Sequence, residues 1–216
     1  MRRAGRAKAR ARGRLIVVEG LDGAGTTTQS RLLGERLAAE GRRVHVTAEP
    51  SRGPVGALVR QVLTRRIVGD GAGFDPAALA LLFAADRLDH HAVEIAPKLA
   101  QGIHVVSDRY TLSSLAYQGL ATGDMAWVEA VNSRAPAADV TLFLRTRPEV
   151  ALRRRRAASL DREIFEVSSF QRRVAESYAR AIVRLRSAGE KVLELDGEAP
   201  VETVARSLWD AVRRLA

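Results

Sequence analysis

The chain has 216 residues, a length typical of one α/β domain with a well-buried core. Hydrophobic residues make up 46% and charged residues 28%, and no apolar run approaches the roughly 20 residues that span a membrane. Cysteine is absent, which excludes disulfide bonds and thiolate metal sites. This composition fits a cytoplasmic enzyme and gives no indication of a membrane partner.

The formal net charge of +10 is concentrated at the amino terminus. Residues 1–14 contain seven bases and no acid, separated by small residues without apolar periodicity. This composition predicts a disordered basic arm over residues 1–14, and it lacks the apolar stretch of a secretory signal. A solvated tail or a misassigned start codon is the ordinary interpretation of such an arm, and attraction to nucleic acid is the more specific one.

Five short apolar runs are expected to form strands: residues 15–18, 44–46, 103–106, 140–144 and 192–193. Helical periodicity follows the first run as far as residue 41 and recurs at 55–67, 77–100, 124–134, from 148, at about 168–188 and after 200. In the last helix, the side chains expected to face the core are Val201, Val204, Leu208, Trp209 and Val212. Strands that alternate with helices predict a doubly wound α/β fold, in which helices cover both faces of a five-stranded parallel sheet.

A glycine-rich segment lies between the first predicted strand and the first predicted helix. Its glycines at 20 and 25 and its hydroxyl at 27 match the phosphate-binding pattern G-x-x-x-x-G-K-[ST]. The backbone N–H groups of such a loop and the start of the next helix form a nest for anions. We therefore predict that the phosphates of ATP bind to Gly20, Leu21, Asp22, Gly23, Ala24, Gly25, Thr26 and Thr27. The alternative is a glycine turn that binds no nucleotide.

Thr26 occupies the position at which this pattern has lysine. Threonine cannot neutralise charge on the β- and γ-phosphates, and phosphoryl transfer depends mainly on positioning and electrostatics. By analogy with the removal of one oxyanion donor, we expect a loss of about 100- to 1000-fold in rate unless another cation replaces the lysine.

Further motifs follow the loop: Glu49-Pro50, Leu82-Phe83-Ala84-Ala85-Asp86-Arg87, Asp108-Arg109-Tyr110, Ser113-Ser114-Leu115-Ala116-Tyr117-Gln118-Gly119, Pro148-Glu149, Asp161-Arg162 and Phe170 with Tyr178. With these motifs in this order, the sequence resembles the bacterial thymidylate kinases from residue 15 almost to the C-terminus. One such motif alone would be weak evidence, but their shared order and spacing are specific. The resemblance implies a P-loop NTPase-type three-layer sandwich, with a nucleoside monophosphate kinase domain over residues 15–216 and a mobile lid at about residues 153–166.

The resemblance also implies an activity, namely transfer of a phosphoryl group from ATP to dTMP in the pathway to dTTP. Mg²⁺ is the implied cofactor, ATP and dTMP are the implied small-molecule partners, and a homodimer is the implied assembly. One alternative is a nucleotide-binding paralogue with little catalysis and a sensor or partner role, which Thr26 motivates. Another is a different monophosphate acceptor, or binding of nucleic acid through the basic arm, although nucleic acid is not the expected partner.

Asp108 and Arg109 follow a buried predicted strand, so we expect them at the carboxyl edge of the sheet, where ligands bind. Asp108 would hold Mg²⁺ opposite the Thr27 hydroxyl, and Arg109 would clamp the acceptor phosphate. By resemblance, arginines of the lid replace the missing lysine, which gives as catalytic candidates Asp108, Arg109, Arg153, Arg156 and Arg162. The alternatives are a structural ion pair for the first two and a solvated helix face for the others.

The residues that the resemblance implies for dTMP include an aromatic pair. Phe83 would stack on the base, Arg87 one helical turn later would contact the base edge or phosphate, and Tyr117 would disfavour a 2′-hydroxyl. The full implied set is Asp22, Glu49, Phe83, Arg87, Arg109, Ser114, Tyr117 and Gln118. The sequence departs from the family at two places, because Ala48 replaces an arginine before Glu49 and Arg145 replaces an acid. The histidines have no metal-ligand spacing.

Overall fold

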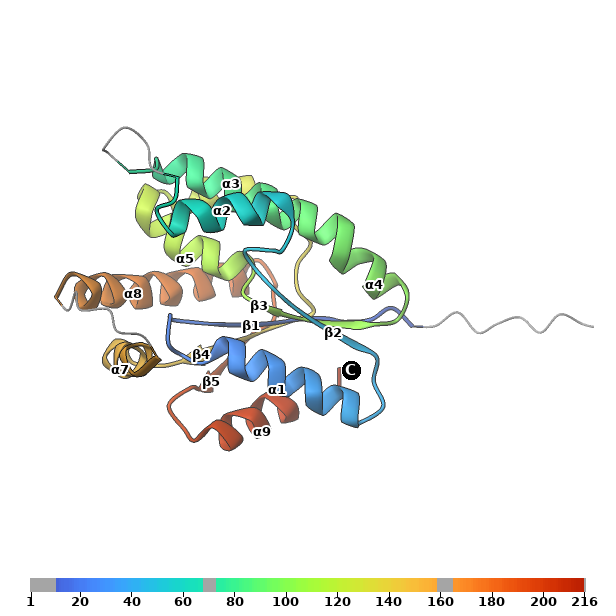
Figure 1. Cartoon of the computed structure of the whole chain (residues 1–216). Coiled ribbons are helices and arrows are strands. Elements are labelled where there is room, and N and C mark those ends of the chain that lie inside the picture. Colours follow the sequence, from blue (N-terminus) through green and yellow to red (C-terminus); the bar gives the residue numbers. More distant parts are fainter. Residues whose placement is uncertain (1–10, 68–72, 159–164, 216) are drawn as a thin grey trace, which may run out of the picture.

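The computed structural model describes residues 11–67, 73–158 and 165–215. Within them the sheet has five strands in the order β2-β3-β1-β4-β5, and every neighbouring pair is parallel. The strands are β1 (Leu15–Gly20), β2 (Val44–Ala48), β3 (His104–Asp108), β4 (Val140–Arg145) and β5 (Val192–Asp196). The predicted five-stranded parallel sheet is therefore confirmed. Because all strands run in one direction, their carboxyl ends meet at a single edge, near α7 and α8 in Figure 1.

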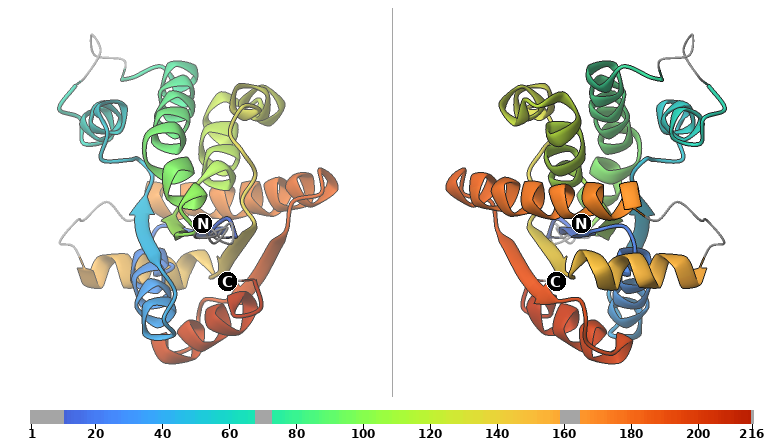
Figure 2. Two further views of the ribbon diagram at one scale, coloured as in Figure 1. Left: turned by 90° about the vertical axis from the view of Figure 1, so that its right-hand side faces the viewer. Right: turned by 90° about the vertical axis from the view of Figure 1, so that its left-hand side faces the viewer.

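Helices form a layer on each face of this sheet (Figures 1 and 2). One layer contains α1 (Thr26–Ala39), α7 (Pro148–Ala158) and α9 (Val201–Val212). The other contains α2 (Pro54–Leu63), α3 (Pro76–His90), the π-helical turn η1 (His91–Ile95), α4 (Ala96–Ala100), α5 (Thr111–Thr122), α6 (Met125–Asn132) and α8 (Phe165–Ser187). All six residues of β1 are buried, as expected for a central strand covered on both faces. The predicted three-layer architecture is confirmed.

The structure corrects several details of the predicted elements. The single helix expected over residues 77–100 is divided into α3, η1 and α4, and the helix expected over residues 55–67 ends at Leu63. Helix α5 is not among the predicted helices, although its buried residues Leu112, Leu115, Ala116 and Gly119 follow a helical spacing. Val201 was expected to face the core and is 48% exposed, because it is the first residue of α9, at the open end of the helix. The three later valine and leucine positions of α9 are buried, and Trp209 packs against the core under the guanidinium of Arg36.

The last residues of the predicted basic arm are held against the body of the protein. The N–H of Gly13 donates to the carbonyl of Leu99 at 2.8 Å, and a Cβ at residue 13 would lie 2.0 Å from the carbonyl oxygen of Ile103. The side chain of Arg14 donates to Asp139 at 2.9 Å. Residues 11–14 thus differ from the expected disorder, and residues 1–10 lie outside the described residues.

The predicted lid is described only in part. Residues 153–158 form the end of α7 and residues 165 and 166 the start of α8, whereas residues 159–164 lie outside the described residues. Arg162 falls in that gap, so its predicted catalytic role stays a prediction. In the described part of the chain, no helix has both the length and the apolar character needed to cross a membrane.

Candidate functional site

The glycine loop joins β1 to α1 at the carboxyl edge of the sheet. Gly23 and Gly25 both have φ of 93°, a left-handed conformation that side chains rarely adopt. At residue 23 a Cβ would lie 2.2 Å from the carbonyl oxygen of Ala151, so the loop also needs glycine for close packing. Gly25 caps α1, and no side chain caps the helix, which leaves its first N–H groups facing the loop. This geometry is that of an anion-binding nest at a helix N-terminus.

Thr27 and Asp108 meet beside this loop, as the sequence predicts. The hydroxyl of Thr27 donates to Asp108 Oδ2 at 2.5 Å. The second carboxylate oxygen, Oδ1, is buried and has no hydrogen-bond partner among the described residues. A buried carboxylate oxygen without a donor is suited to a cation, and a hydroxyl with a carboxylate is a donor set that Mg²⁺ accepts. The two residues therefore fit the predicted Mg²⁺ site.

No cluster of three or more acidic or histidine side chains suited to a metal occurs in the described part of the chain. Mg²⁺ commonly keeps several waters and binds through one or two protein groups together with substrate phosphates. The pair formed by Thr27 and Asp108 matches this sparse type of site.

Arg109 extends from the end of β3 toward the glycine loop. Its φ is 74°, an uncommon backbone conformation for a residue other than glycine and one that clusters at functional sites. Its guanidinium donates to Asp22 Oδ1 at 2.5 Å and to the Ser113 hydroxyl at 3.0 Å, and it lies 5.4 Å from the ring centre of Tyr117. Arg109, the predicted phosphate clamp, thus lies next to two residues predicted to bind dTMP, Asp22 and Tyr117, and next to Ser113, the neighbour of Ser114.

A buried carboxylate with no predicted role, that of Glu19, holds the residues that surround Arg109. Glu19 is fully buried in β1 and accepts hydrogen bonds from the N–H groups of Tyr110 and Ser113 at 2.8 and 3.0 Å. The hydroxyls of Ser113 and Tyr178 donate to its other oxygen at 2.6 and 3.2 Å. Burial raises the pKa of Glu19, although Arg109 and the donors around it oppose the shift. Its sequence signal was an acid inside an otherwise apolar run.

Tyr178 links this carboxylate to Arg109. Its hydroxyl accepts a hydrogen bond from Arg109 Nη1 at 3.2 Å and lies 3.1 Å from the carbonyl oxygen of Gly20. The tyrosine is completely buried, which, together with the nearby charge of Glu19, raises its pKa well above the ordinary value. The network therefore fixes both the backbone turn that carries Arg109 and one side of its guanidinium.

Glu49 and Arg87 lie in a second buried network, below the end of β2. Arg87 is 1% exposed, and its Nε donates to Glu49 Oε2 at 2.9 Å. Its Nη1 donates to the side chain of Asn132, and Nη2 to the carbonyl of Tyr110 and the hydroxyl of Ser114, each at 3.1 Å. Every nitrogen of this guanidinium is thus engaged by protein groups. The implied contact of Arg87 with the nucleotide stays a prediction.

His90, which has no predicted role, completes the second network. Its Nδ1 lies 3.3 Å from Glu49 Oε1, and its Nε2 lies 2.9 Å from the Thr47 hydroxyl. Burial disfavours the charged ring, but the hydrogen bond and charge of Glu49, with Glu94 and Asp86 beyond, raise the pKa of His90. The signal in the sequence was its position one turn after Asp86-Arg87, on the same buried helix face.

The remaining residues implied for dTMP lie around these networks. The hydroxyl of Tyr117 is buried and has no hydrogen-bond partner among the described residues. Its ring makes an edge contact with Tyr178, with ring centres 5.9 Å apart, and a tilted contact with Phe170 at 6.5 Å. Gln118 is buried on α5, and Phe83 is half-buried on α3, one turn before Arg87. The structure brings Ser114 to Arg87 and Tyr117 to Arg109, whereas the roles implied for Phe83 and Gln118 stay predictions.

A cavity of about 770 Å³ opens beside the glycine loop. Its walls come from Gly23 to Gly25, the start of α1, the segment between β5 and α9, and two arginines of α7. These arginines are Arg154, whose guanidinium donates to the carbonyls of Gly197 and Glu198 at 2.7 and 3.2 Å, and Arg155. The candidates Arg153 and Arg156 do not line it.

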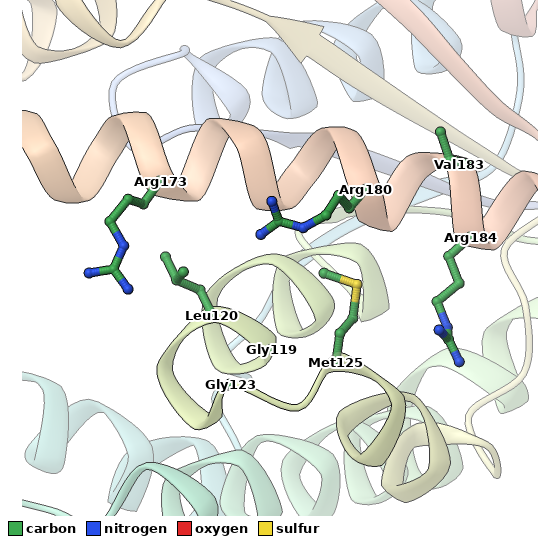
Figure 3. Close-up of a pocket in the computed structure, with 8 residues that line it drawn as sticks. All are labelled: Gly119, Leu120, Gly123, Met125, Arg173, Arg180, Val183 and Arg184. Atoms are coloured by element: carbon green, nitrogen blue, oxygen red, sulfur yellow. The ribbon is translucent and has the colours of Figure 1, made fainter.

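Two further cavities lie away from the loop. One of about 510 Å³ is bordered by α5, α6 and α8, and Figure 3 shows Arg173 and Arg180 extending from α8 along it while Leu120 and Met125 face them from below. The other, of about 450 Å³, lies at the amino edge of the sheet around Arg14 and His104.

The glycine loop at the end of the first strand of a parallel sheet, with a hydroxyl and a carboxylate beside it, defines the class of P-loop nucleotide-binding proteins. Comparison with known proteins narrows the class, because the family model described as thymidylate kinase matches residues 18–208. The chain belongs to the thymidylate kinase family.

Similar proteins occur in archaea and cyanobacteria. A "Putative thymidylate kinase" of Aeropyrum pernix is 41% identical over 185 residues, which cover 85% of this chain and 86% of the relative. A "Probable thymidylate kinase" of Pyrobaculum aerophilum is 36% identical over 203 residues, or 93% and 96% of the two chains. A "Thymidylate kinase" of a Nostoc species is 36% identical over 204 residues, or 92% and 94%.

Proposed function

We propose that this protein transfers the γ-phosphoryl group of ATP to the phosphate of dTMP, which forms dTDP and ADP. The observation that carries the proposal is that the glycine loop, the pair Thr27–Asp108 and the cation of Arg109 lie together at the carboxyl edge of the sheet. The family match extends over nearly the whole chain and supports the same reaction.

The geometry suits phosphoryl transfer without a strong general base, because a monophosphate oxygen is already anionic. The N–H groups of the loop and of the start of α1 would bind the phosphates of ATP. Arg109, held by Asp22, Ser113 and Tyr178, would place the acceptor phosphate in line and spread the charge that moves between the two nucleotides. The cavity beside the loop has the location and size for the rest of ATP.

Thr27 and Asp108 are the residues that would hold Mg²⁺. A bound Mg²⁺ ion supplies charge neutralisation at the phosphate oxygens. On the acceptor side, the guanidinium of Arg109 lies over the ring of Tyr117, and Phe83, Ser114 and Gln118 complete the proposed dTMP site. Glu49 and Arg87 would support this site from below, through the hydrogen bond from Arg87 to Ser114.

The rate of phosphoryl transfer depends on which group replaces the missing lysine. Thr26 is only 5% exposed and packs toward residue 20, where a Cβ would come within 3.3 Å of its methyl group. We propose that arginines of α7 supply the absent positive charge, because Arg154 and Arg155 border the cavity next to Gly23 and Gly25. The alternative, a catalytically impaired paralogue, has the same architecture and differs only in rate.

An assay of ADP release with ATP, dTMP and Mg²⁺ tests the function directly. We expect turnover that requires both dTMP and Mg²⁺ and that disappears in a Thr27→Ala, Asp108→Ala double variant. Thr26→Lys should change this turnover by less than about tenfold, because another cation already acts there. Ala39→Lys is the matched control, since it adds the same charge at an exposed position of the same helix, outside the cavity. A gain of about 100-fold or more in Thr26→Lys, from a near-zero wild type, would establish the impaired paralogue instead.

We also propose a homodimer, as the family resemblance implies, and place its interface on α2, α3 and η1. Large apolar side chains are exposed on these neighbouring elements: Leu58, Leu63, Leu81, Leu88 and Val93. Leu81 and Leu88 are seven residues apart and share one face of α3. Light scattering should give the mass of a dimer, and Leu81→Lys with Leu88→Lys should give a monomer that retains its helical circular dichroism. A monomeric wild type would refute this assembly.

A further inference from the structure

The cavity at the amino edge of the sheet, here called the amino-edge pocket, is lined by five basic or titratable side chains. These are Arg12, Arg14, Arg42, Arg43 and His104. Figure 1 shows the chain entering β1 at this edge, at the opposite end of the sheet from α7 and α8, and Figure 2 views this end in its left panel. The pocket is therefore separate from the proposed kinase site.

The charges in this pocket are strongly unbalanced. Arg12 and Arg14 share a single carboxylate, since Asp139 lies 3.3 Å from one guanidinium and 2.9 Å from the other. The guanidinium of Arg42 makes no hydrogen bond or ion pair with any described residue, and that of Arg43 donates only to the neutral carbonyl of Gln101. Among the described residues, Asp139 thus pairs with two of the four guanidinium groups, which leaves an excess of positive charge in a concave site.

The backbone fixes this arrangement in place. The N–H of Arg14 donates to His104 Nδ1 at 3.1 Å, and the N–H of Leu15 donates to Asp139 at 2.8 Å. Together with the anchoring of Gly13 to Leu99, these bonds hold the segment that carries Arg12 and Arg14. A preformed cluster of cations binds an anion at a lower entropic cost than mobile side chains do.

His104 is suited to add a neutral donor. Because its Nδ1 accepts a backbone N–H, the proton of the neutral ring resides on Nε2. Burial and the charges of Arg42 and Arg14 lower the pKa of His104, against the opposing charge of Asp139. The ring therefore offers one N–H at neutral pH without adding to the repulsion among the arginines.

We propose that the amino-edge pocket binds a polyphosphate chain, such as inorganic tripolyphosphate or the phosphates of a free nucleoside triphosphate. Guanidinium groups match phosphate oxygens in pairs, and four of them converge on a cavity of about 450 Å³. The described lining contains no phenylalanine, tyrosine or tryptophan, the large aromatic side chains on which the bases of single-stranded nucleic acid usually stack. The chemistry therefore favours a small polyphosphate over a nucleic acid.

An NMR titration tests the proposal. The full chain is titrated with sodium tripolyphosphate at constant ionic strength, and the histidine ring signals are followed. The chain has four histidines, so a His104→Gln variant identifies the signal of interest. We expect a saturable shift of the His104 signals and a rise in the pKa of His104, because the bound anion offsets the charges of Arg42 and Arg14. Binding at the glycine loop leaves these signals unchanged, since that loop lies at the other edge of the sheet.

Arginine-to-alanine variants then distinguish binding in the amino-edge pocket from a general electrostatic attraction of the anion to the protein. Arg42→Ala should weaken the binding measured at His104 by about tenfold, as expected for the loss of one charge-assisted contact. Arg180→Ala is the matched control, because it removes the same charge from α8, in the cavity of Figure 3, and should leave the affinity within about twofold. Unchanged His104 signals, equal effects of the two variants, or tighter binding of single-stranded DNA than of tripolyphosphate would each overturn the proposal.

Discussion

Two buried glutamates support the candidate site, and they do so with opposite chemistry. Glu19 accepts four hydrogen bonds, all from neutral donors, which are two backbone N–H groups and two hydroxyls. Glu49 instead faces the guanidinium of Arg87 and the imidazole of His90. Both carboxylates position residues of the proposed dTMP site, one through Arg109 and the other through Ser114.

The two networks should therefore differ in how well they tolerate substitution of the central glutamate. A hydroxyl can donate or accept, so two of the partners of Glu19 can adapt to an altered acceptor. A guanidinium can only donate, so Arg87 requires an acceptor with matching charge. Breaking a buried ion pair leaves an uncompensated charge, whereas a neutral network loses only part of its hydrogen bonding.

The largest expected effect is that of Glu49→Gln. The amide would present N–H groups to Arg87 or to His90, and a guanidinium that is 2% exposed would lose its carboxylate. We expect the free energy of unfolding to fall by about 3–5 kcal/mol, measured by urea denaturation. A loss below about 1 kcal/mol would show that the pair contributes little and that the contrast with Glu19 is wrong.

Tyr178→Phe tests the neutral network at an intermediate magnitude. The variant removes the hydroxyl that contacts Glu19 and Arg109, so we expect a loss of about 1–3 kcal/mol in unfolding free energy. Arg109 should also lose its alignment, which lowers kcat/KM for dTMP. Tyr110→Phe is the matched control, because its hydroxyl donates at 3.1 Å to the carbonyl of Pro136, away from Arg109. Equal activity losses in the two variants would contradict a positioning role for Tyr178.

His90 gives the ionic network a pH dependence. Its pKa is raised in the folded state, so protonation of the ring stabilises the fold. This contribution is complete below about pH 6.5, the unfolded-state pKa, and is lost as the pH rises through the folded-state pKa. Relative to His90→Gln, the wild type should therefore lose about 1 kcal/mol of unfolding free energy as the pH rises. Parallel pH profiles of the two proteins would show that His90 stays in one charge state.

The sequence predicted the sheet because each strand is a short apolar run bounded by turns, a local signal. It also predicted the meeting of Thr27 and Asp108, since both follow strands whose carboxyl ends share one edge. The network of Glu19 was not predictable in this way, because Tyr178 lies 159 residues further along the chain and arrives through the packing of α8.

The arginines of α7 show a second limit of prediction from sequence. Four consecutive arginines do not reveal which of them faces the loop, because each residue turns a helix by about 100°. The structure places Arg154 and Arg155 at the cavity, three and four residues after Ala151, which is fully buried. The spacing from that alanine identifies the two arginines that line the cavity, and the catalytic roles predicted for Arg153 and Arg156 stay predictions.

Glu19→Gln should have the smallest effect and is the sharpest test of the comparison. The amide oxygen can accept the two backbone N–H groups, and its NH₂ can donate to the hydroxyls of Ser113 and Tyr178 once these reverse. Burial raises the pKa of Glu19, so wild-type stability falls as the pH rises from 4.5 through the folded-state pKa. The glutamine variant has no such pH dependence. Its free energy of unfolding should differ from that of the wild type by less than about 1 kcal/mol at pH 7, and it should become more stable relative to the wild type as the pH increases. A loss as large as that of Glu49→Gln would mean that Glu19, too, depends on its charge and that Arg109 is its essential partner.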